Sequence, residues 1–274
     1  MSIAPLPDQC CNLSIAGIVV ALHCASPALA ASLRQRYAAF AAHSAEDDVA
    51  LRIALGPLAP AHEPLPPTDE AILRGPSAQL AGPGYRGWVD LDQRLARFEL
   101  VPVAAAAAIE YLLRVAYALL GFTAGGLLIH AAGVARGGRA YLFLGPSGTG
   151  KTTVARNSPG ALVLNDDLVL AMPSAEGWAI YATPFSNPSQ VPPAGPLAAP
   201  LAAIFRLVQS QHVFLEPLSQ ARGLAELLAQ VPLLTLNPAS GPQLLGRARA
   251  ILAAAPMQRL HFLPDASLWD TIVC

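Results

Sequence analysis

A glycine-rich segment with a single lysine is the strongest chemical signal in this sequence. Residues 145–152 read Gly-Pro-Ser-Gly-Thr-Gly-Lys-Thr, and Lys151 is the only lysine among the 17 lysine and arginine residues of the chain. The segment matches the phosphate-binding pattern Gly-x-x-x-x-Gly-Lys-[Ser/Thr]. Its glycines let the backbone turn sharply and approach a phosphate closely. Because the chain uses arginine everywhere else, we infer that an ammonium group is needed at this point.

Each residue of the segment has an expected role. Successive backbone N–H groups would form an anion-binding nest, reinforced by the N-terminus of the following helix. Lys151 would place its ammonium on the outer phosphates, and Thr152 its hydroxyl on Mg²⁺. The expected cofactors are therefore ATP and Mg²⁺, held by Gly145, Pro146, Ser147, Gly148, Thr149, Gly150, Lys151, Thr152 and Thr153. The alternative is a glycine turn that binds no ligand.

Two acidic residues, Asp166 and Asp167, end or interrupt the apolar run 161–171. Burying acids among Val and Leu costs free energy unless they are paired or hold a metal. An Asp at the end of a strand that follows a phosphate loop is a common Mg²⁺ ligand. Neighbouring residues on a strand point to opposite faces, so the two acids can have different tasks. The alternative is a surface turn at the end of the strand.

His130 lies upstream of the loop, in Leu-Leu-Ile-His-Ala-Ala-Gly. A lone histidine at a strand end is more often structural than catalytic. However, a strand antiparallel to the one that leads into the loop would bring His130 close to the phosphates. A catalytic role is therefore the second interpretation of this residue.

The elements that must position these groups are a strand before the loop and a helix after it. The strand is predicted over 140–144, and the helix opens at Thr152 and stops before Pro159-Gly160. Upstream, a helix over 104–120, ended by Gly121, precedes a strand over 127–130 that returns through Gly137-Gly138. The other predicted elements are strands over 161–171, 178–182, 201–208 and 259–263, a proline-rich lid loop over 183–200, and helices over 223–228 and 241–254.

The first hundred residues predict a separate small α+β domain, 1–102, before a catalytic domain, 103–274. Strands are expected over 15–22 and 49–55 and a helix over 27–42. They are followed by a surface loop with short extended pieces over 56–84. A β-hairpin is expected from residues 87–92 and 94–100. The fold class is therefore α/β, with a mixed sheet around the phosphate loop and a small α+β N-terminal domain.

Composition excludes several classes of protein. The net charge of −1 gives no reason to expect nucleic acid or an anionic membrane as a partner. The apolar stretch 103–134 contains Glu110, Arg114 and His130 and several glycines, which is unlike a membrane span. Residues 16–31 resemble a signal peptide but have no basic residue before them. Together with an ATP site, this indicates a cytoplasmic protein.

The four cysteines are Cys10, Cys11, Cys24 and Cys274. A metal site built from the first three with His23 is conceivable, but the spacing fits no standard pattern. Buried or idle thiols are the favoured interpretation.

The order of His130, the glycine loop and the Asp166-Asp167 pair resembles the catalytic core of the HPr kinase/phosphorylase family, which is related in fold to ATP-dependent phosphoenolpyruvate carboxykinase. Segments 126–134, 139–153 and 163–170 carry the resemblance. A narrower group is more similar still, namely the HPr kinase-related proteins encoded beside peptide-tailoring genes, including lasso-peptide kinases. Its patterns resemble residues 181–185, 196–208, 216–219 and 260–265 with Trp269, so the resemblance covers residues from about 88 to the end.

This resemblance implies a role for each matching residue. Residues 145–153 would hold the ATP phosphates, with Thr152 on Mg²⁺. Asp167 would be the base that accepts the proton of the substrate hydroxyl, Asp166 would support the metal or its waters, and His130 would orient or assist the acid. The implied fold is a phosphate-loop core with a mixed sheet.

The sequence also departs from HPr kinases. The family's Glu after the Asp pair, in a Glu-x-Arg-Gly context, has no counterpart, and the corresponding stretch 181–188 offers only Ser186 or Asn187. The basic segment that binds HPr is also missing, so HPr is not the expected acceptor.

We therefore expect a kinase that transfers the γ-phosphate of ATP to a hydroxyl, first of all a serine of a ribosomally made, lasso-type peptide. The alternatives are a small-molecule kinase acting on free serine and a nucleotide-binding module without catalysis. Expected partners are the peptide or small-molecule acceptor, without nucleic acid or membrane, and the sequence leaves a homo-oligomer open.

Overall fold

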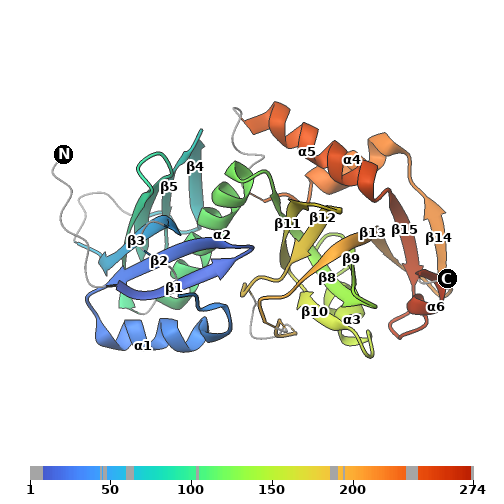
Figure 1. The fold of residues 1–274 in the computed structure, drawn as a ribbon, viewed down its shortest axis with the longest axis horizontal. Helices are drawn as coiled ribbons and strands as arrows, with labels where there is room; N and C mark the ends of the chain where they lie inside the picture. The colour runs from blue at the N-terminus through green and yellow to red at the C-terminus, as the bar shows by residue number, and fades with distance from the viewer. Residues whose placement is uncertain are drawn as a thin grey trace. The chain divides into compact units, whose positions relative to one another are not determined.

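The computed structural model describes residues 9–43, 45, 48–59, 65–102, 105–185, 191–193, 195–232 and 240–272. They form two compact units, each built around its own mixed β-sheet (Figure 1). One unit takes in the described residues up to Leu120 together with Ser240, and the other takes in the rest. The division falls within helix α2 (Ala105–Thr123). The protein is thus of mixed α/β class.

The first unit holds a seven-stranded sheet in the order β1-β2-β3-β7-β6-β5-β4. Strands β2, β3 and β7 run parallel to one another, and the other neighbours are antiparallel. The strands are β1 (Gln9–Ile15), β2 (Ile18–Cys24), β3 (Val49–Pro57), β4 (Glu70–Arg74), β5 (Ser77–Gly82), β6 (Tyr85–Asp90) and β7 (Leu95–Leu100). Helix α1 (Pro27–Arg36) and the short 3₁₀ helix η1 (Ala38–Phe40) connect β2 to β3.

Helix α2 is long and apolar enough to cross a membrane by length and composition, yet 72% of its apolar 18-residue window is buried within the protein. Its Tyr117 hydroxyl donates to the carbonyl of Leu13 at 2.7 Å. Its charged residues are also paired, since Glu110 accepts from Arg114 at 2.6 Å and forms an ion pair with Arg36. These are the properties of a core helix, and the evidence for a membrane span is correspondingly weak.

The second unit holds an eight-stranded mixed sheet. Its path is β10-β8-β11-β12-β13-β15-β14, and β9 pairs with both β8 and β13. The strands are β8 (Leu127–Arg136), β9 (Arg139–Leu144), β10 (Leu162–Asn165), β11 (Leu168–Ser174), β12 (Gly177–Tyr181), β13 (Ala198–Gln209), β14 (Phe214–Pro217) and β15 (Met257–Phe262). The helices are α3 (Lys151–Arg156), α4 (Gln220–Leu228), α5 (Gly241–Ala254) and α6 (Leu268–Ile272).

Strand β8 organises the part of this sheet that matters for chemistry. One of its edges pairs with β9, with Ala131 opposite Leu144. Strands β10 and β11 both run antiparallel to β8. Asn165 of β10 is opposite Gly133, and Leu168 of β11 is opposite His130. Three residues of extended chain cannot cross over to the far edge of β8 while advancing three positions along it. Strands β10 and β11 therefore form one line along the same edge, interrupted only at the two acids.

The two faces of this sheet are covered by different helices. On β15, Met257 lies toward Gly223 of α4, whereas Phe262 lies against Gly150 at the start of α3. Because side chains alternate along a strand, α3 and α4 are on opposite faces. The α3 face carries the aromatic core. There Trp269 packs edge-on against Tyr141 and Phe143, with 5.3 and 5.9 Å between the ring centroids.

The helices and strands agree with the sequence in most of the second unit. The strand 140–144, the return at Gly137-Gly138 and the helix 241–254 are confirmed there. The hairpin 87–100 of the first unit is also confirmed. The predicted lid loop 183–200 lies partly outside the described residues, and β13 begins at Ala198, earlier than expected.

Four expectations are wrong. Residues 15–22 are not one strand, because Ala16 and Gly17, with φ of 53° and 77°, make a turn between β1 and β2. Residues 70–82 form the paired hairpin β4–β5, where only short extended pieces within a surface loop were expected. Helix α2 does not end at Gly121, where the chain packs against Leu170, but continues to Thr123. The strand 161–171 is broken at Asp166-Asp167.

The cysteines of the first unit are free thiols, with Cys10 and Cys24 buried. Within the described ranges, no three His, Cys, Asp or Glu side chains gather as a metal cage. Cys274 lies outside the described residues.

Candidate functional site

The glycine loop connects β9 to α3, as its sequence context predicts. Its glycines are needed for two different reasons. Gly145, Gly148 and Gly150 have φ of 154°, 83° and 107°, a region in which side chains are rarely found. A Cβ on Gly150 would also lie 2.5 Å from the Phe262 ring, whereas a Cβ on Gly148 would meet nothing within 4 Å. Gly148 therefore faces open space, and Gly150 is packed from behind.

Side chains around the loop hold its backbone in place. The Thr149 hydroxyl donates to the carbonyl of Pro146 at 2.8 Å. Gln209, the last residue of β13, donates its amide to the carbonyl of Gly148 at 2.9 Å. Helix α3 has only six residues, so its dipole adds less than the sequence led us to expect. Lys151 therefore carries the positive charge of the loop.

Lys151 is buried, at 8% exposed, and its ammonium is held by the loop itself. Its Nζ donates to the carbonyl of Gly145 at 2.7 Å and to that of Pro146 at 3.4 Å. Desolvation lowers the pKa of Lys151, the carboxylates of Asp167 and Asp166 raise it, and the guanidinium of Arg206 adds to the lowering. Both acids thus lie close enough to act electrostatically on this lysine.

The two acids stand at a bend between β10 and β11 and not within a strand. Asp166 is almost fully buried, at 1% exposed, and the side chain of Asp167 is 14% exposed. Burial of this degree argues against the alternative that the two acids form a simple surface turn. The expectation that the acids point to opposite faces is also wrong, because the bend lets both line one cavity.

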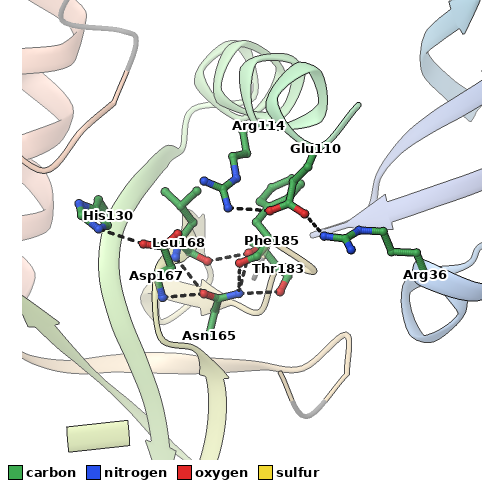
Figure 2. A network of polar contacts seen from close by, with 9 residues as sticks. All are labelled: Arg36, Glu110, Arg114, His130, Asn165, Asp167, Leu168, Thr183 and Phe185. Carbon is green, nitrogen blue, oxygen red and sulfur yellow. Dashed lines mark hydrogen bonds and ion pairs between the residues drawn. The ribbon is translucent and has the colours of Figure 1, made fainter. Parts of the chain in front are cut away.

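Asn165 shapes this bend, and sequence reasoning missed it. Its side-chain oxygen accepts from the backbone N–H of Asp167 at 2.7 Å and of Leu168 at 2.9 Å, an Asx turn (Figure 2). Its amide donates to the carbonyls of Thr183 at 3.0 Å and Phe185 at 2.8 Å. The available signal was the triplet Asn-Asp-Asp itself, since Asn is a residue that replaces strand bonds with side-chain bonds.

His130 reaches the second acid from the neighbouring strand. Its Nε2 lies 3.0 Å from Oδ1 of Asp167, as the dashed line in Figure 2 marks. The contact follows from the register, because His130 is opposite Leu168, the residue after Asp167. The prediction that an antiparallel β8 would carry His130 toward the loop is confirmed by the pairing of β8 with β9.

These groups share one cavity of about 310 Å³. Its lining brings together all four candidate catalytic residues, His130, Lys151, Asp166 and Asp167, with most of the loop and with Gln209. From the predicted nucleotide-binding set, it includes Ser147, Gly148, Gly150, Thr152 and Thr153. The cavity thus combines residues of the glycine loop and its lysine with two aspartates and a histidine.

A divalent cation fits the residues present. Oδ2 of Asp166 accepts from the backbone N–H of Val191 at 3.2 Å, while Oδ1 is buried and has no hydrogen-bond partner among the described residues. Such an oxygen is a natural metal ligand, and Thr152 lines the same cavity. Mg²⁺ often takes one or two protein ligands and completes its shell with phosphate oxygens and water. The alternative ligands Ser186 and Asn187 lie outside the described residues.

Comparison with known proteins gives one finding. The family model described as SynChlorMet cassette protein ScmC matches residues 106–241. No curated protein matches the chain. The matched segment contains His130, the glycine loop and both acids, so the cavity falls within the part of the chain that is similar to this family.

Proposed function

We propose that this protein is an ATP-dependent kinase that transfers the γ-phosphate to a hydroxyl group, most simply a serine of a ribosomally made peptide of the lasso type. The observation that carries the proposal is the contact of His130 with Asp167 in the same cavity as Lys151 and the glycine loop. A phosphate-binding loop alone would suit any nucleotide-binding protein. A carboxylate held by an imidazole beside that loop is what a transfer reaction needs in addition.

The division of labour follows from the positions of the groups. The amides of the loop and the Lys151 ammonium would hold the phosphate oxygens and neutralise the charge that develops on them. Mg²⁺, held by Thr152 and Asp166, would supply further charge neutralisation. The oxygen of the acceptor hydroxyl would bond to the γ-phosphorus while Asp167 accepts the hydroxyl proton. The bond from that phosphorus to the bridging oxygen would break, leaving ADP. His130 would fix the orientation of the Asp167 carboxylate and take part in releasing the proton.

The resemblance to HPr kinase-related proteins supports the same assignment, as a phosphate-loop core within an α/β fold. The description of the matching family model names no reaction, so the choice of acceptor rests on the sequence resemblance. A role at the phosphates would also explain why the only lysine of the chain stands at position 151, since a compact ammonium suits phosphate oxygens. We place the protein in the cytoplasm, where ATP is available.

The test is Mg²⁺-dependent ATP consumption by wild type and by Asp167→Asn, with a serine-containing precursor peptide, with free serine, and without acceptor. Mass spectrometry of the peptide is the readout. We expect the peptide to gain phosphate in the wild type and turnover to fall by 10² to 10⁴-fold, roughly, in Asp167→Asn, while ATP affinity changes little. Asp92→Asn, an exposed acid in the β6–β7 turn, is the matched control.

Phosphate on free serine but not on the peptide would favour the small-molecule alternative. ATP binding without transfer to any acceptor, in the wild type, would contradict the kinase proposal and leave a nucleotide-binding module. Equal turnover in wild type and Asp167→Asn would refute the assignment of the base.

A further inference from the structure

Asn165 is fully buried, and both ends of its side-chain amide are occupied. Its oxygen receives two backbone N–H groups, those of Asp167 and Leu168. Its nitrogen gives two backbone contacts, to Thr183 and Phe185, and a weaker one of 3.3 Å to the Thr183 hydroxyl. A side chain that only satisfied itself in the core would not need to join two separate segments of chain.

The first of these segments is the bend that carries the acids. Between the pair Asn165–Gly133 and the pair Leu168–His130, the two acids make no ladder pairing with β8. Their backbone therefore depends on other partners for its conformation. The Asn165 oxygen supplies the partner for the N–H of Asp167, the residue whose carboxylate meets His130, and for the N–H of Leu168 after it.

The second segment follows β12. Thr183 is also fully buried, and its hydroxyl donates to the carbonyl of Leu168 at 2.6 Å, which is a second bond between this segment and β11. Farther along, the N–H of Val191 reaches Asp166 at 3.2 Å. Thr183 and Val191 are thus both bonded to the segment that carries the acids, Thr183 through Asn165 and Val191 through Asp166.

We propose that Asn165 is a positioning residue for the transfer reaction, which sets the direction of the Asp167 carboxylate and registers the segment 183–185 against the acid pair. This inference rests on the proposed function and deepens it. Asn165 does not line the cavity. It acts through Asp167, and its loss should therefore affect the reaction and leave nucleotide binding by the glycine loop intact.

Two variants separate the two ends of the amide. Asn165→Ala removes both, and Asn165→Asp keeps an acceptor for the N–H groups of Asp167 and Leu168 but removes the donor to Thr183 and Phe185. Ser158→Ala is the matched control, because Ser158 is buried in the same unit and makes two side-chain hydrogen bonds, to Val154 and from Trp269, away from the acids.

Three quantities are measured for each variant, namely the affinity for Mg²⁺ with the non-hydrolysable analogue AMP-PNP, the turnover of ATP with the acceptor, and amide hydrogen exchange by NMR. Misplacing a catalytic group by about 1 Å costs on the order of 10²-fold in rate. We expect Asn165→Ala to lose about that much in kcat while AMP-PNP affinity stays within about twofold. Exchange at Asp167 and Leu168 should rise about tenfold or more in Asn165→Ala, and less in Asn165→Asp.

Ser158→Ala should change neither turnover nor exchange at these two amides. Turnover of Asn165→Ala close to that of wild type, or a parallel fall of AMP-PNP affinity and kcat, would overturn the proposal. If the wild type transfers phosphate to no acceptor, the kinase function itself fails, and the exchange measurement alone decides whether Asn165 holds the bend. Unchanged exchange at both amides would then refute it.

Discussion

The contrast between Gly148 and Gly150 gives a prediction that can be worked out from the structure. Both have positive φ, so an alanine at either site pays about 1–2 kcal/mol of backbone strain. Only at Gly150 would the new Cβ lie 2.5 Å from the Phe262 ring, and overpacking of this kind costs about 1–3 kcal/mol more. We therefore expect Gly150→Ala to lower the free energy of unfolding by about 2–5 kcal/mol, and Gly148→Ala by about 1–2 kcal/mol.

Urea unfolding of both variants, and of each combined with Phe262→Leu, measures these terms. The smaller Leu side chain should relieve the contact at position 150, so a double-mutant cycle should give a coupling of about 1–3 kcal/mol with Gly150→Ala and about zero with Gly148→Ala. Equal losses in the two single variants, or a coupling near zero at both positions, would refute the packing explanation. Binding of AMP-PNP, measured in parallel, reports separately whether a methyl group in the open space at Gly148 obstructs phosphate.

Three other changes test different parts of the molecule. Replacing Lys151 by Met should abolish AMP-PNP binding in calorimetry, and retained binding would contradict the role of Lys151 at the phosphates. The free energy of unfolding should stay unchanged or rise, because burial already lowers the pKa of this ammonium. Arg247 donates to the carbonyls of Phe122 and Gly126 and stacks on the Phe122 ring, so Arg247→Leu should cost about 2–3 kcal/mol in urea unfolding, and a loss below about 0.5 kcal/mol would count against it. Burial raises the pKa of Tyr37 from 10.0 to about 12, so its contribution to stability is complete below pH 10 and is lost as the pH rises through about 12. Tyr37→Phe should therefore lose stability less steeply over that interval, by up to about 1.4 kcal/mol per pH unit, and identical slopes would exclude this tyrosine as a cause.

The loop and its neighbours could be predicted because their signals are local. The glycine pattern, the turn at Gly137-Gly138 and the apolar strand before the loop each specify their own backbone conformation, and together they fix which strand end His130 occupies. The contact between His130 and Asp167 then follows from pairing alone.

Elements that depend on distant partners were predicted less well. Strands β4 and β5 follow a proline-rich stretch, and they are strands because β6 pairs with β5. The turn at Ala16 and Gly17 has only the glycine as a sequence signal, since alanine at positive φ is uncommon. Gly121 remains helical because it packs against Leu170, a neighbour that the local sequence does not reveal.

The candidate site shows the same division. The residues that would touch substrate were identified from their types and spacing, whereas Asn165, Thr183 and Gln209 were not. Their importance lies in carbonyl and N–H groups that are close only in the folded chain. Supporting residues of this kind have no fixed distance in sequence from the groups that they hold.

Strand β8 has a consequence for how this chain can change length. Strand β9 runs antiparallel along one edge of β8, and β10 and β11 run antiparallel along the other. The register of β8 therefore sets the position of the glycine loop relative to the acid pair. Adding or removing one residue within β8 between His130 and Ala135 would exchange its two faces and shift loop and acids relative to each other. An insertion at the Gly137-Gly138 turn would leave both pairings unchanged. Natural insertions and engineered tags should therefore be tolerated at that turn and excluded from the strand only a few residues away.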